Sequence, residues 1–101
     1  MKILIICSAG MSSSLIANKM QQELQKMGIE GVVDAFSSSE MISRMDDYDI
    51  VLVGPQLRYM YAEIADTCAK AGKTALLIDM KAYGKQDAAA IIKQVQEALS
   101  K

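Results

Sequence analysis

The residues best suited to chemistry lie in one short segment near the start of the chain. Cys7 ends an apolar run that begins at Ile3 and has the composition of a buried strand. The following residues are small and lead into a helical pattern, which we predict to begin between Ser12 and Leu15. The whole segment reads Cys7-Ser8-Ala9-Gly10-Met11-Ser12-Ser13-Ser14.

A loop of this kind predicts an anion site above the Cys7 thiol. Gly10 and the short side chains allow successive backbone N–H groups to converge, and a helix N-terminus adds donors with a partial positive charge. The same surroundings favour the thiolate over the thiol, which makes Cys7 a candidate nucleophile. Phosphoryl transfer needs mainly positioning and charge stabilisation, so such a thiolate is suited to carry a phosphoryl group without a general base.

Each cysteine can also be interpreted as a core residue with no chemical role. Cys7 can be a buried core residue, with the three serines only capping the helix. The coincidence of a strand end, a glycine-containing loop and a helix start favours the anion site instead. Cys68 lies on an apolar helical stripe with Ile64 and Ala71, which predicts a core role. The methionines also fall at helical spacing, and we expect neither a metal site nor a cofactor.

Composition narrows the classes of function. The 101 residues contain 11 Lys and Arg against 12 Asp and Glu, without the basic stripe of a nucleic-acid-binding protein. With no histidine, neither a Cys/His nor a Ser/His/Asp catalytic unit can form. The longest apolar run, 3–7, is far shorter than the ~20 residues of a membrane-spanning helix and does not resemble a secretory signal. We expect one cytoplasmic domain over residues 1–101, with free thiols and no direct membrane insertion.

Alternating patterns predict the elements that hold the loop. Four apolar runs, at 3–6, 31–36, 50–53 and 74–78, are typical of strands buried on both faces of a parallel sheet. Between and after them lie helical stripes: Ile16, Met20, Leu24 and Met27, ending at Gly28; Leu57, Met60, Ile64, Cys68 and Ala71, ending at Gly72; and Ala88, Ile91, Ile92, Val95 and Leu99. A capping box formed by Ser37 and Glu40 predicts a short helix containing Met41, Ile42 and Met45.

The βαβαβαβα order predicts a doubly wound, three-layer α/β/α fold whose four-stranded parallel sheet has the strand order 2-1-3-4. Ligands bind to such sheets beyond the carboxyl ends of the strands, where the order reverses, which here is between the first and third strands. Gly54-Pro55-Gln56 follows the third strand, and we predict a turn there with Gln56, Arg58 and Tyr59 at the rim of the site. For Tyr83-Gly84-Lys85, after the fourth strand, we predict a solvated turn, with a partner surface as the alternative.

The loop from Cys7 to Ser14 resembles the phosphocysteine loop of the lactose/cellobiose-type IIB components of the bacterial sugar phosphotransferase system. The resemblance continues through Val53-Gly54-Pro55-Gln56, Tyr59 and Tyr83-Gly84-Lys85 and covers nearly the whole chain. It implies that Cys7 accepts a phosphoryl group from a phosphohistidine on a IIA component. Cys7 would then donate it to a sugar held by the membrane-embedded IIC component, such as the β-linked disaccharides cellobiose, chitobiose or lactose. Family members commonly have threonine where this chain has Ser13, which keeps the hydroxyl.

Four other classes of protein place chemistry on similar folds. Low-molecular-weight tyrosine phosphatases and arsenate reductases have an arginine six positions after their cysteine, where this chain has Ser13, so the bidentate clamp on the phosphoryl group is absent. A disulfide oxidoreductase would need a second cysteine in a Cys-x-x-Cys pair. A receiver domain would need an acidic residue at the end of the first strand, and a flavin protein is disfavoured by an aromatic content of 5% without tryptophan.

Overall fold

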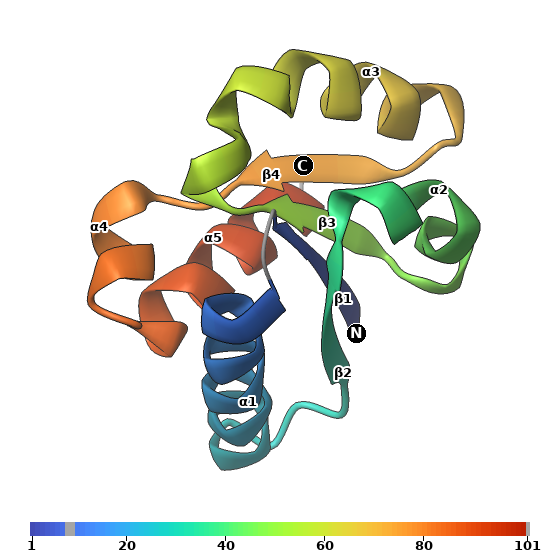
Figure 1. Ribbon diagram of the computed structural model, residues 1–101. Helices are drawn as coiled ribbons and strands as arrows, with labels where there is room; N and C mark the ends of the chain where they lie inside the picture. The colour runs from blue at the N-terminus through green and yellow to red at the C-terminus, as the bar shows by residue number, and fades with distance from the viewer. Residues whose placement is uncertain (8–9, 101) are drawn as a thin grey trace.

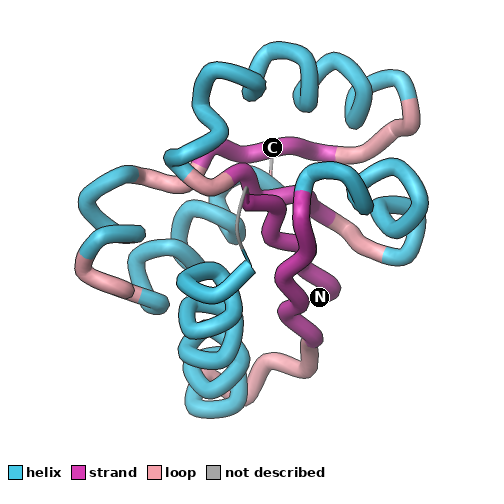
Figure 2. Tube along the Cα trace, viewed as in Figure 1, coloured by secondary structure: helices cyan, strands magenta, loops and turns pink. Residues whose placement is uncertain are grey.

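The computed structural model describes residues 1–7 and 10–100, with side chains for residues 1–7 and 14–100 (Figure 1). The described residues form a parallel four-stranded sheet with the order β2-β1-β3-β4, which confirms the predicted topology. The strands are β1 (Lys2–Cys7), β2 (Val32–Ser37), β3 (Ile50–Val53) and β4 (Thr74–Leu77). Helices α1 (Gly10–Lys26) and α5 (Ala88–Leu99) cover one face of the sheet, while α2 (Met41–Arg44) and α3 (Tyr61–Lys70) cover the other (Figure 2).

Strand β1 divides the core into two parts because successive side chains point to opposite faces of a sheet. Ile3 and Ile5 pack in the cluster that contains the apolar residues of α1 and α5. Leu4 and Ile6 pack in the cluster beneath α2 and α3. All four side chains are fully buried. The central strand is therefore apolar at every one of these positions, as a strand covered on both faces must be.

The prediction of strands buried on both faces is confirmed for β1 and β3 and is wrong for β2 and β4. The two central strands are buried along almost their whole length. The two outer strands are mostly half-buried. Each outer strand pairs with one neighbour only, and the helices do not fully cover the sheet edges.

Helix α1 begins at Gly10, earlier than the predicted start between Ser12 and Leu15. Its stripe is buried as expected at Ile16, Met20 and Leu24. Met27 is 45% exposed, because the helix has ended at Lys26 and the chain turns through Gly28 with φ +71°. A positive φ of this kind is easiest for glycine.

The predicted capping box does not form. Residues 38–47 make a 3-10 turn (Ser38–Glu40), the single turn of α2 and a second 3-10 turn (Met45–Asp47). The Ser37 hydroxyl does not cap a backbone N–H group and lies 2.9 Å from the hydroxyl of Ser39. Met41 and Met45 are buried, but Ile42 is 71% exposed, because the broken helix presents only one narrow face to the sheet.

The third predicted helix is divided, and one helix was not predicted. A 3-10 segment, η3 (Pro55–Met60), precedes α3, whose C-terminal turn contains Gly72 with φ +73°. A short helix, α4 (Met80–Gly84), occupies the region predicted to be a solvated turn, and Tyr83 within it is only 9% exposed. The turn prediction was wrong because the Asp79 side chain caps α4, accepting a hydrogen bond from the Ala82 N–H at 3.0 Å.

Candidate active site

Cys7 is the last residue of β1 and lies between the two neighbouring strands at the carboxyl edge of the sheet. It is 1% exposed and lies opposite Ser37 of β2 in the strand register. On the other side, the preceding residue Ile6 lies opposite Val53, the last residue of β3. The thiol is therefore at the point where the strand order reverses, as predicted.

The loop after Cys7 is described in part. Ser8 and Ala9 lie outside the described residues, as do the side chains of Gly10, Met11, Ser12 and Ser13. The backbone from Gly10 onward forms the first turn of α1, so this helix begins three residues after the cysteine, and Ser14 is exposed on it. A helix N-terminus this close in sequence supplies backbone donors for an anion. The contacts of the loop side chains with a phosphoryl group stay a prediction.

Gly54 joins the cysteine to the segment after β3. Its N–H donates a hydrogen bond to the carbonyl oxygen of Ile6 at 2.9 Å. A Cβ atom at this position would lie 3.7 Å from the Cβ of Cys7 and 2.7 Å from the Oε1 of Gln56. The Cys7 and Gln56 side chains therefore lie against the same glycine, and any side chain there would displace the glutamine amide.

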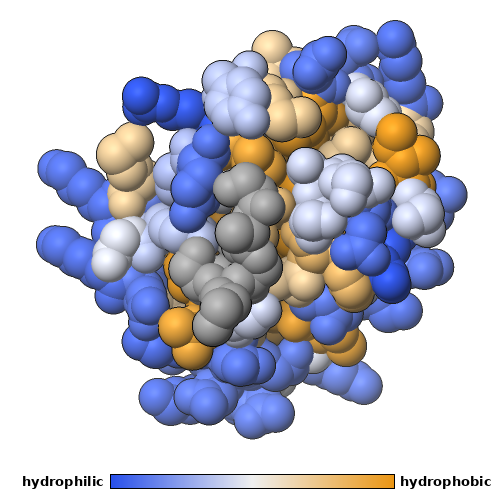
Figure 3. Space-filling model, in the orientation of Figure 1, coloured by the Kyte–Doolittle hydropathy of each residue, from blue (hydrophilic) through white to orange (hydrophobic). Residues whose placement is uncertain are grey.

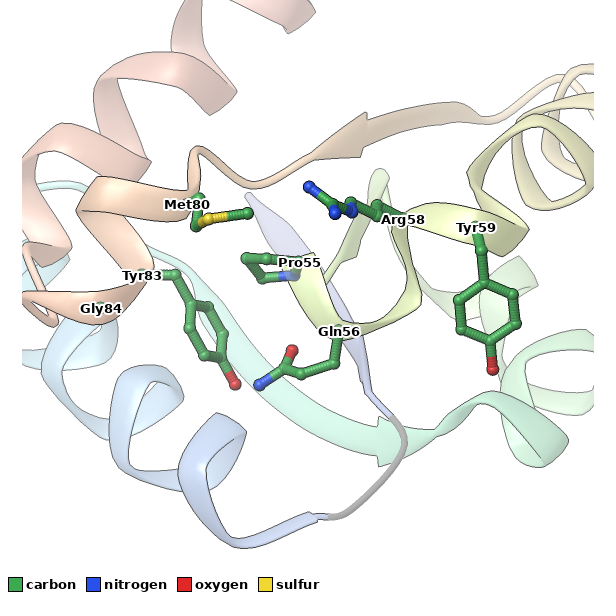
Figure 4. Close-up of a pocket in the computed structure, with 7 residues that line it drawn as sticks. All are labelled: Pro55, Gln56, Arg58, Tyr59, Met80, Tyr83 and Gly84. Carbon is green, nitrogen blue, oxygen red and sulfur yellow. The ribbon is translucent and has the colours of Figure 1, made fainter.

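A cavity of about 500 Å³ opens next to Gly54 (Figure 4). It is lined by η3 and α4, through Pro55, Gln56, Arg58, Tyr59, Met80, Tyr83 and Gly84. The predicted rim residues Gln56, Arg58 and Tyr59 all line this cavity, and so does Tyr83, for which a partner surface was the alternative prediction. In Figure 4 the Gln56 amide and the Tyr83 hydroxyl are turned toward each other, Arg58 lies toward Met80 at the other end, and Tyr59 points away.

The cavity walls contain one residue that the sequence did not single out, Met80, and also Gly84, which was predicted to lie in a solvated turn. Both belong to α4, and the signal for this helix was the N-cap spacing between Asp79 and Ala82. Met80 is 56% exposed and Tyr59 is 77% exposed. Figure 3, which shows the face that carries the start of α1, has hydrophilic residues interspersed with small hydrophobic patches rather than one continuous apolar surface.

Cys68 lies away from this edge, in the last turn of α3. It is fully buried in the cluster with Leu4, Val51 and Ile64, and burial raises the pKa of its thiol. No disulfide joins the two cysteines. A thiol held in an apolar core is a poor nucleophile, so the predicted core role of Cys68 agrees with its surroundings.

None of the helices in residues 1–7 and 10–100 is long and apolar enough to cross a bilayer. Within the same residues, no three side chains of the metal-binding types gather at one place.

The fold and the position of the thiol define a class: a doubly wound α/β protein with a cysteine at the ligand-binding edge of its sheet. Known proteins make the assignment more specific. The family model described as "PTS system, Lactose/Cellobiose specific IIB subunit" matches residues 2–94. The chain belongs to this IIB family of the sugar phosphotransferase system, whose members are phosphotransferase subunits that work with IIA and IIC components.

Individual relatives agree with this assignment. The oligo-β-mannoside-specific EIIB component of Bacillus subtilis is 35% identical over 98% of this chain and 93% of its own. A solution structure of a cellobiose-specific IIB component from Borrelia burgdorferi has a TM-score of 0.76 at 25% identity, covering 99% of this chain and 89% of the other. A lactose-specific IIB domain from Streptococcus pneumoniae shares the fold, with a TM-score of 0.87 at 18% identity over 97% of this chain and 96% of the other.

Proposed function

We propose that Cys7 is the residue that carries the phosphoryl group in this IIB component. The observation that supports it is the position of Cys7 at the end of the central strand, at the strand-order reversal and three residues before the start of a 17-residue helix. Cys68, the other thiol, is fully buried in an apolar core. Loop residues 8–14 would bind the phosphoryl oxygens through their N–H groups and through the hydroxyls of the serines among them.

Two transfers make up the proposed cycle. In the first, the N–P bond of a phosphohistidine on IIA breaks as the Cys7 sulfur bonds to phosphorus, and the thiol proton passes to the imidazole. In the second, the phosphoryl group moves to a sugar hydroxyl held by IIC. We propose a β-linked disaccharide such as cellobiose, chitobiose or lactose as the acceptor, and the names of the relatives, oligo-β-mannoside-specific and cellobiose-specific, support this class.

The carrier, acting in the cytoplasm as one domain, is favoured over a low-molecular-weight phosphatase or arsenate-reductase-like enzyme. Membership of the IIB family supports transfer to a partner rather than to water. The position six residues after Cys7 is Ser13, which offers no guanidinium for rapid hydrolysis.

Replacing one cysteine at a time tests the assignment. Cys7→Ser keeps the size of the side chain but removes a readily ionised thiol, so phosphoryl acceptance should be lost while the fold survives. The matched control, Cys68→Ser, should still accept one phosphoryl group. Intact-mass measurement after incubation with phospho-IIA, under non-acidic conditions, separates the two outcomes. Acceptance by folded Cys7→Ser at the parent level would show that another residue is phosphorylated.

A further inference from the structure

The cavity between η3 and α4 presents two polar side chains, Gln56 and Arg58, that have no hydrogen-bond or ion-pair partner among the described residues. Among the described residues, neither the Gln56 amide nor the Arg58 guanidinium forms a hydrogen bond or an ion pair. The amide offers two donors and one acceptor, and the guanidinium offers five donors. Both side chains line the same cavity, so their hydrogen-bonding groups are available to a ligand there.

The rest of the lining is mainly apolar, apart from the hydroxyls of Tyr59 and Tyr83, and carries no opposing charge. Pro55, Met80 and the ring of Tyr83 form walls between Gln56 at one end and Arg58 at the other (Figure 4). None of the lining residues is acidic. The volume of about 500 Å³ lies within the range of small-molecule sites, ~300–1,000 Å³. Hydrogen-bond donors at the two ends can bind hydroxyl groups at the edge of a ring, and the apolar wall between them can pack against the C–H bonds on the face of that ring.

The cavity also lies close to Cys7. A Cβ atom placed on Gly54 would lie 2.7 Å from the Oε1 of Gln56 and 3.7 Å from the Cβ of Cys7. Transfer from a phosphorylated Cys7 requires an acceptor oxygen close to the phosphorus atom and in line with the sulfur. On the basis of the proposed function, we infer that this cavity receives one ring of the acceptor sugar during transfer, with Gln56 and Arg58 hydrogen-bonding its hydroxyls.

The step balances without a further reactant. The oxygen of a sugar hydroxyl forms a bond to phosphorus as the S–P bond breaks, and the hydroxyl proton goes to the departing sulfur, which regenerates the Cys7 thiol. Gln56 and Arg58 act by binding and orienting the ring. Under this proposal they bind the sugar and not the IIA partner, so the two half-reactions should depend on them differently.

Single-turnover measurements of each half-reaction test this. Gln56→Ala and Arg58→Gln should each slow transfer from phospho-IIB to sugar about tenfold at subsaturating sugar, in the presence of membranes containing IIC, because each loses hydrogen bonds to the ring. Transfer from phospho-IIA to IIB should stay within about twofold of the parent. Gln25→Ala and Arg44→Gln make the same side-chain changes outside the cavity and should leave both half-reactions unchanged.

A binding measurement gives a readout that does not depend on activity. In amide spectra of the unphosphorylated protein, glucose 6-phosphate at up to about 10 mM should perturb the backbone resonances of Arg58 and Gly84. Inorganic phosphate should leave these two resonances in place, because it lacks the ring. The spectra also show whether each variant is folded, and Gln56→Asn and Arg58→Lys should recover part of the lost rate.

The result expected is a selective loss in the sugar half-reaction together with a ring-dependent spectral change. The inference is overturned if the variants slow both half-reactions alike, as they would if the cavity received a side chain of a partner protein. It is equally overturned if they slow neither, or if glucose 6-phosphate and inorganic phosphate act alike on Arg58 and Gly84. Phosphorylation of Cys7 in the parent is measured separately, so the inference can fail while the proposed function stands.

Discussion

Gly54 allows the link between Cys7 and the cavity to be tested with a single methyl group. Its backbone, with φ −63° and ψ 148°, is in a region that alanine adopts without strain. The methyl group of Gly54→Ala would lie 2.7 Å from the Oε1 of Gln56, 3.4 Å from the carbonyl oxygen of Ile6 and 3.7 Å from the Cβ of Cys7. The first of these distances is far too short, and the atom concerned is the end of a flexible, exposed side chain.

We expect the protein to respond by moving Gln56 and leaving the sheet in place. Turning the glutamine out of its present rotamer and accepting the close Ile6 oxygen should cost about 0.5–1.5 kcal/mol. Exchanging glycine for alanine in a compatible conformation returns about 0.4–1 kcal/mol by restricting the unfolded chain. The free energy of unfolding should therefore stay within about 1 kcal/mol of the parent. Sugar phosphorylation should slow about as much as in Gln56→Ala, because the amide no longer faces the cavity.

A double-mutant cycle isolates the contact. In a Gln56→Ala background the methyl group meets no amide, so Gly54→Ala should there be neutral or stabilising by chemical denaturation and should cause no further loss of rate. If Gly54→Ala costs more than about 2 kcal/mol in both backgrounds, the methyl group is displacing the backbone or Cys7 rather than Gln56, and the reasoning from this geometry is refuted.

Two other substitutions test the core and the β2 edge. Cys68→Ser should lower the free energy of unfolding by about 1–3 kcal/mol, because it places a hydroxyl in an apolar cluster; Cys68→Ala, which adds no polar atom, should be less harmful if the hydroxyl is the cause. The Tyr48 hydroxyl donates a hydrogen bond to Asp34 at 2.7 Å, and burial and this acceptor raise the pKa of Tyr48 to about 12. Since the unfolded chain ionises first, near pH 10, this tyrosine should contribute stability that is present below pH 10 and lost between pH 10 and 12. Tyr48→Phe should reduce that loss in pH-dependent unfolding, and an unchanged pH profile would contradict it.

The topology and the position of the thiol could be predicted because they depend on strong local signals. Continuous apolar runs identified all four strands, and their alternation with helical stripes left few possible strand orders. Cys7 at the end of the first run was then bound to lie at the reversal point. Burial along β2 and β4 was overestimated because a sequence pattern does not reveal which strands are at the edges of a sheet.

The walls of the cavity could be predicted only in part. Gln56, Arg58 and Tyr59 were expected at the rim, but Tyr83 was expected in a solvated turn. The short helix that buries Tyr83 was missed because five residues give too little periodicity to recognise. Its capping aspartate, Asp79, was the usable signal. The prediction of a capping box at Ser37 was wrong although the sequence has the required spacing. The segment after Ser37 is broken into turns, and the Ser37 hydroxyl contacts Ser39 instead of a backbone N–H group.

Strand β1 pairs with a strand on each side, so it should be less mobile than the segments around it. Its amides are hydrogen-bonded within the middle of the sheet, so their hydrogen exchange should require opening of the whole domain. The short helical segments η3 and α4 should exchange through local opening. Cys7 should thus be carried by a slowly exchanging strand, while the cavity walls belong to segments expected to open independently. Substitutions in those walls can change what the cavity accepts without loosening the strand that holds the sulfur.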